Sequence, residues 1–195
     1  MALPASDAFT DSDGVSLPSH NAGWTAQDNG CQIHSNGAQS ITGVAYSFNY
    51  WSGDTFNSDH LSFCTMLGVF TGGPCVRMAG TNNCYMYDID DAGTTYLFKR
   101  VGGSYTNISP GGLTLYIGGE IAKIIANGTT LQVFKNGAQE GSDVTDSSLS
   151  GGAAGVMCFN GGVVTVLDDW QGDNLTAAVP LFTTLGARHL RVRRA

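Results

Sequence analysis

Short β-type runs separated by turn residues recur about every ten residues along this chain, and this spacing constrains the fold more than any other feature. The run from 43 to 50 (GVAYSFNY) alternates apolar residues with small or polar ones, as a half-buried strand does. Further runs of this kind are Leu61–Phe70, Cys75–Met78, Cys84–Ile89, Thr95–Val101, Leu113–Ile117, Glu120–Ala126, Leu131–Lys135, Gly155–Phe159 and Val163–Leu167. Between them we find no helical period longer than about one turn. The pattern predicts an all-β, two-sheet antiparallel sandwich.

Turn chemistry and composition support the same fold class. Asn-Gly tolerates positive φ at both central positions of a tight hairpin. We therefore expect a hairpin over residues 120–135 that turns at Asn127-Gly128, and a second turn at Asn136-Gly137. Charged residues make up only 13% of the 195 residues, and there are 27 glycines. This composition favours many short strands in one domain of sandwich size.

Charge divides the chain into two parts. All 16 acidic residues lie between Asp7 and Asp173 with five of the nine basic ones, so this body carries 5 − 16 = −11. So acidic a body would repel nucleic acid, and we expect no nucleic-acid partner. Pro180 cannot continue a strand ladder. We predict a sandwich over 1–176 and a docking arm over 177–195, whose contacts come from Phe182, Arg188, Arg191, Arg193 and Arg194.

The N-terminal residues Met1-Ala2-Leu3-Pro4 have neither a charged start nor an apolar run. We therefore expect no secretory signal peptide. No stretch approaches 18 apolar residues, so we also expect no membrane-spanning segment and no membrane partner.

Three segments resemble the concanavalin A-like lectin/glucanase superfamily, and in particular its laminin G-like jelly-roll modules. The segment 7–24 (DAFTDSDGVSLPSHNAGW) is similar to the opening strand of such modules. The segment 120–159 resembles their central hairpin, Ser/Asp loop and following strand, and 164–175 (VTVLDDWQGDNL) resembles the last strand. The resemblance implies a jelly roll in which the first and last strands pair. Function stays open, because such modules bind sugars or proteins, decorate virions or carry glycosidase sites.

Catalytic and metal motifs are weak. Glycoside hydrolysis needs two suitably placed carboxyl groups, and the two glutamates, Glu120 and Glu140, do not fit the family's Glu-x-Asp-x-x-Glu strand motif. The nearest acidic cluster, Asp88-Ile-Asp90-Asp91, is better interpreted as a solvated strand end, so we predict no enzymatic activity. Asp11-Ser-Asp13-Gly14, with Asp168 and Asp169, offers a structural calcium site or plain turn chemistry. We expect no cofactor.

A glycan site is the best-supported binding hypothesis. Sugars stack on exposed aromatic rings and bond to nearby carboxylates. Tyr50, Trp51 and Asp54 combine these groups, with Tyr46 nearby, and Tyr96 and Tyr105 are further candidates; Trp24 and Trp170 are expected in the core. The cysteines, Cys31, Cys64, Cys75, Cys84 and Cys158, have no zinc-site spacing. A bridge between Cys75 and Cys84 is compatible with a hairpin, and buried free thiols are the alternative.

Two functions follow from these observations. The first is a non-enzymatic structural protein of a phage-like virion, which decorates the capsid or tail surface and can also bind host glycans. The acidic body, the basic arm and the expected absence of an export signal favour this function. Its expected partners are a major capsid or other virion protein and further copies of the chain. The second is a stand-alone, lectin-like carbohydrate-binding module. The first function implies location in the virion after synthesis in the host cytoplasm.

Overall fold

The computed structural model describes residues 3–41, 46–68, 71–80, 82–159 and 167–176. Its one helix in this part of the chain, α1, is a single turn over Leu17–His20, capped by the Ser16 side chain. The strands are β1 Ala5–Asp7, β2 Trp24–Asp28, β3 Cys31–Ile33, β4 Ala38–Ser40, β5 Tyr46–Trp51, β6 His60–Met66, β7 Gly72–Ala79, β8 Asn83–Ile89, β9 Thr95–Val101, β10 Ser104–Asn107, β11 Glu120–Asn127, β12 Thr130–Lys135, β13 Ala138–Thr145, β14 Ala153–Phe159 and β15 Leu167–Asn174.

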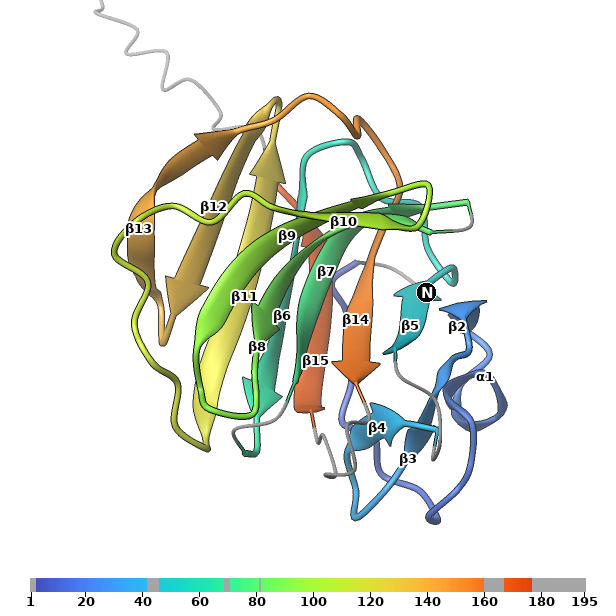
Figure 1. Cartoon of the computed structure of the whole chain (residues 1–195). Coiled ribbons are helices and arrows are strands. Elements are labelled where there is room, and N and C mark those ends of the chain that lie inside the picture. The colour runs from blue at the N-terminus through green and yellow to red at the C-terminus, as the bar shows by residue number, and fades with distance from the viewer. Residues whose placement is uncertain (1–2, 42–45, 69–70, 81, 160–166, 177–195) are drawn as a thin grey trace, which may run out of the picture.

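These strands form two packed antiparallel sheets (Figure 1), so the predicted all-β sandwich is confirmed. Sheet A has the order β13-β12-β11-β6-β15-β4-β3, with β1 beside β15. Sheet B has the order β10-β9-β8-β7-β14-β5-β2. The first strand pairs with the last through Ala5↔Gly172 and Asp7↔Trp170, as the resemblance implied.

Both expected hairpins are present, and one turns a residue later than predicted. In the β11–β12 hairpin Asn127 pairs with Thr130, so the two loop residues are Gly128-Thr129 rather than Asn127-Gly128. Of these only Gly128 has positive φ (+56°), which matches a loop with glycine at its first central position. In the β12–β13 hairpin Asn136 and Gly137 both have positive φ, as a type I′ turn requires.

The predicted strand over 113–117 is wrong. This segment has no strand partner, and Leu115 and Ile117 are 65% and 68% exposed. Tyr116, between them, is buried and donates its backbone N–H to Gly93 O. The alternation that resembled a strand therefore places one ring in the core from a loop.

The main core lies between the two sheets. It combines side chains from sheet A, such as Cys64, Ile124 and Val133, with side chains from sheet B, such as Val76 and Val156. The tryptophans Trp24, Trp51 and Trp170 pack together in it, with ring centroids 4.5 to 5.6 Å apart. Trp24 and Trp170 are therefore core residues, as expected.

Candidate functional site

Sheet B carries a second, separate cluster on its outer face, the face turned away from sheet A. On β8, Tyr85 and Tyr87 enter the main core, whereas Cys84 and Met86 belong to the second cluster. Because successive side chains of a strand alternate between faces, the two clusters lie on opposite sides of sheet B. The rings that share the outer face, called here the aromatic face, are Tyr46, Phe48, Tyr50, Tyr96, Phe98, Tyr105 and Phe159.

Ring contacts show that sheet B curls around this face. Tyr46 on β5 stacks on Tyr105 of β10 with centroids 5.2 Å apart, although four strands separate β5 from β10. In a flat sheet those strands would be about 24 Å apart. Phe48 lies at the bottom of the curl and is completely buried. The aromatic face is therefore concave, and rings from its two sides meet across it.

Polar groups without partners gather on the same face. Five buried side-chain atoms of the described residues lack a hydrogen-bond partner: Gln27 Oε1, Asn49 Nδ2, Asp88 Oδ1, Arg100 Nε and Arg100 Nη1. Three of these atoms belong to Asp88 and Arg100, which alternation places on the aromatic face with Met86 and Phe98. An unpaired buried polar atom is costly, so several of them on one face indicate a place where a ligand could supply the partners.

Asp88 is the most perturbed acid of this face. Asp88 is 5% exposed. Burial, followed by the nearby Asp90 carboxylate, raises the pKa of Asp88 to about 7. Burial first, and the Asp88 charge second, also raise the pKa of Tyr46.

The three predicted glycan-binding residues do not share one surface. Tyr50 lies half-buried on the aromatic face, opposite Gly155 of β14. Trp51, the next residue, points the other way into the main core and is 1% exposed, so its prediction as a stacking ring is wrong. Its indole N–H donates to Asp54 Oδ2 at 2.9 Å, which gives Asp54 a structural partner.

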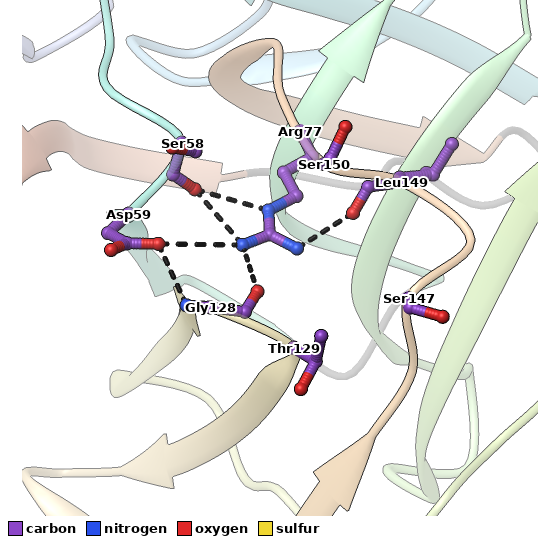
Figure 2. Close-up of a pocket in the computed structure, with 8 residues that line it drawn as sticks. All are labelled: Ser58, Asp59, Arg77, Gly128, Thr129, Ser147, Leu149 and Ser150. Atoms are coloured by element: carbon purple, nitrogen blue, oxygen red, sulfur yellow. Dashed lines mark hydrogen bonds and ion pairs between the residues drawn. The ribbon is translucent and has the colours of Figure 1, made fainter.

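A pocket of about 340 Å³ at one end of the sandwich is a second candidate (Figure 2). Its buried charged group is Arg77, which is 1% exposed and has φ +53°. The Arg77 guanidinium donates to main-chain carbonyls of Ser58 (3.1 and 3.2 Å), Leu149 (2.7 Å) and Gly128 (2.5 Å), with Asp59 3.7 Å away. These bonds join three chain segments, so we assign Arg77 a structural role.

The carboxylates that the sequence offered as catalytic candidates bind other groups of the protein. Lys135 Nζ lies 3.9 Å from Glu120 Oε1 and 3.7 Å from Glu140 Oε1. Glu140 also accepts from the hydroxyl groups of Tyr87 (2.6 Å) and Thr114. Asp90 Oδ1 accepts the backbone N–H groups of the turn that follows it.

The acidic loop near the N-terminus shows turn and histidine contacts. Asp11 accepts from the backbone N–H of Ser12 and contacts His20 Nδ1, and Asp13 accepts from Ser35 N. Within the described ranges no three His, Cys, Asp or Glu side chains are grouped so as to hold a metal ion.

All five cysteines are buried free thiols. Cys75 and Cys84 therefore match the alternative to the bridge between them.

The predicted docking residues, Phe182, Arg188, Arg191, Arg193 and Arg194, lie outside the described residues. The boundary at 176/177, the virion location and the capsid and self-association partners therefore stay predictions. None of the described helices could cross a lipid bilayer.

The two packed antiparallel sheets define a jelly-roll type of β-sandwich. No family model and no curated protein matches it. Among solved structures it is similar to the carbohydrate-binding module CBM66 from Bacillus subtilis, with a TM-score of 0.63 and 19% identity over 78% of this chain and 96% of that one. A B. subtilis protein of unknown function with a galectin-like fold gives 0.54 and 13% over 84% and 97%.

The chain is also similar to the GH43 protein BlXynB from Bacillus licheniformis, with a TM-score of 0.57 and 12% identity over 87% of this chain and 39% of that one. At these identities the comparisons establish the fold. Membership of the concanavalin A-like superfamily, and the laminin G-like assignment within it, stay predictions.

Proposed function

We propose that this chain is a non-catalytic, lectin-like carbohydrate-binding module whose site is the aromatic face of sheet B. The observation that carries the proposal is the combination, on one concave face, of seven aromatic rings with the unpaired polar atoms of Asp88 and Arg100. Aromatic rings offer apolar surface to the C–H faces of sugars, and a few placed polar groups fix the hydroxyls. The fold shared with CBM66 supports the same function.

The absence of catalysis is supported by how the candidate carboxylates are used. The two glutamates of the chain belong to the Lys135 network, and Asp90 caps a turn. A glycosidase needs one carboxyl group to donate a proton and another to attack or to activate water. Asp88 has a raised pKa, as a general acid would, but the second group is not supplied by these residues.

Binding to immobilised and soluble polysaccharides tests the proposal. Tyr50→Ala and Tyr96→Ala remove half-buried rings of the aromatic face, and each should weaken binding about tenfold. Phe63→Ala is the matched control, because Phe63 is a half-buried ring on sheet A. Retention that is unchanged by both tyrosine variants would place the sugar site elsewhere, and release of reducing ends by the purified protein would show catalysis.

A further inference from the structure

The unpaired atoms of the aromatic face also indicate which class of sugar it takes, an inference that rests on the proposed function. We infer that the ligand is a neutral oligosaccharide of at least two sugar residues, held at one end by Asp88 and at the other by Arg100. Both side chains come from adjacent strands, β8 and β9, and face the same side of sheet B.

Asp88 supplies an acceptor atom, Oδ1, that no donor of the described residues contacts. The Oδ1 atom is also buried. A sugar hydroxyl is a donor of the right kind, and a hydrogen bond to a charged or buried acceptor is stronger than one exposed to water. Tyr96 lies directly opposite Asp88 in the strand register, so a sugar bonded to Asp88 would meet an aromatic ring.

Arg100 supplies donors, and its charge is already balanced. Its Nη2 donates to Asp28 Oδ2 at 2.6 Å, and the guanidinium carbon lies 4.4 Å from the ring centroid of Phe48 and 5.3 Å from that of Tyr105. Nε and Nη1 remain without acceptors. They can bond to sugar oxygens, whereas Asp28 leaves little unbalanced positive charge to attract an anion.

Charge and spacing then define the ligand class. Asp88 and Asp90 lie close enough for one to raise the pKa of the other, so an acidic sugar would bring a further negative charge to that end. Asp88 and Arg100 are four residues apart in the register, because Asp88 pairs with Tyr96 and Cys84 with Arg100. Four residues of strand span about 13 Å, which is more than one sugar ring can bridge.

The test measures affinity by titration calorimetry with neutral probes (a soluble glucan, xylan, galactan and fructan and their mono- to pentasaccharides) and acidic probes (polygalacturonate and alginate). Wild-type protein should bind a neutral probe and favour tri- over monosaccharides about tenfold or more, and acidic probes should bind more weakly. Asp88→Ala and Arg100→Lys should each lose about tenfold or more in affinity. Asp91→Ala, which removes an exposed charge from the neighbouring turn, and Lys123→Ala on sheet A are the matched controls.

Far-UV circular dichroism and thermal unfolding establish whether each variant is folded. If Asp88→Ala does not fold, Asp88→Asn, which has the same shape as the native side chain, takes its place in the titration. Equal affinity for mono- and trisaccharides, stronger binding of acidic probes, or wild-type affinity in both Asp88 and Arg100 variants would overturn the inference. If the tyrosine variants still weaken binding in that case, the proposed function stands without this inference. If no probe binds the aromatic face, the proposed function fails first.

Discussion

Arg100 on β9 donates to the carboxylate of Asp28 on β2 at 2.6 Å, although four strands of sheet B lie between them. This bond and the Tyr46–Tyr105 stack are possible only because the sheet curls. The same curl buries Phe48, Met86 and Met157 on a face that would otherwise be open to solvent. The concave shape of the proposed sugar site is thus maintained by contacts between distant strands.

Breaking the Asp28–Arg100 pair should destabilise the protein. The Arg100 side chain is 6% exposed and that of Asp28 33%, so loss of the carboxylate leaves a largely buried cation without its partner. We expect Asp28→Asn to lower the free energy of unfolding by about 1–3 kcal/mol in urea titrations. Asp91→Asn, at an exposed turn, is the control. Equal stability of the two variants would show that the pair does not maintain the curl.

His60 should make the protein sensitive to acid. His60 Nε2 accepts the backbone N–H of Arg77 at 3.0 Å, and Nδ1 lies 2.7 Å from Asn57 O. Burial is the main cause that lowers the pKa of His60, so the folded state favours the neutral ring. This contribution is present above the ordinary histidine value of about 6.5 and is lost as pH falls through the lower folded pKa.

His60→Gln should reduce that sensitivity, because glutamine can accept the Arg77 N–H and does not titrate. The measurement is the difference in melting temperature between pH 7 and pH 5 for wild type and His60→Gln, with His34→Gln as the control. His34 is partly exposed and lies near Asp13. An identical pH dependence in all three proteins would contradict the role of His60.

Arg77 should be required for the arrangement of three chain segments. Its bonds to Ser58, Gly128 and Leu149 need the forked geometry of a guanidinium (Figure 2). We expect Arg77→Lys to cost about 2–4 kcal/mol of stability, with faster amide exchange around residues 128 and 149. Lys123→Arg, whose ammonium lies over the Phe134 ring on sheet A, should change stability little. Wild-type exchange rates in Arg77→Lys would refute the assignment.

Asp88 should lower stability as pH rises. Its pKa of about 7, against an ordinary 3.8, means that the folded state disfavours the ionised form. The neutral carboxyl is accommodated below about pH 4, and the cost grows until the pH passes 7, reaching roughly 4 kcal/mol. Asp88→Asn should therefore gain stability relative to wild type between pH 4 and pH 7.5, as measured by urea unfolding. A parallel pH dependence of the two proteins would show that Asp88 titrates normally.

Strand spacing predicted the sandwich, since most long strands carry alternating apolar residues bounded by turn residues. It missed β1, β2, β3, β4, β10 and β13, which are short or rich in polar residues, and it assigned a strand to 113–117. Trp51 shows that the sequence pattern does not predict which face of a strand a side chain occupies. Tyr50 and Trp51 are adjacent and chemically similar, and only the register with β2 and β14 decides which one faces the core. The site itself depends on the curl of sheet B, which brings Asp28 to Arg100, and no local pattern encodes that contact.

Sugar binding at the aromatic face is tested most directly by one titration. A neutral polysaccharide that binds wild-type protein is titrated into Tyr96→Ala and Phe63→Ala under identical conditions. We expect that Tyr96→Ala, on the concave face of sheet B, loses about tenfold in affinity, whereas Phe63→Ala, on sheet A, retains wild-type affinity. Full affinity in Tyr96→Ala together with a loss of affinity in Phe63→Ala would contradict sugar binding at the aromatic face.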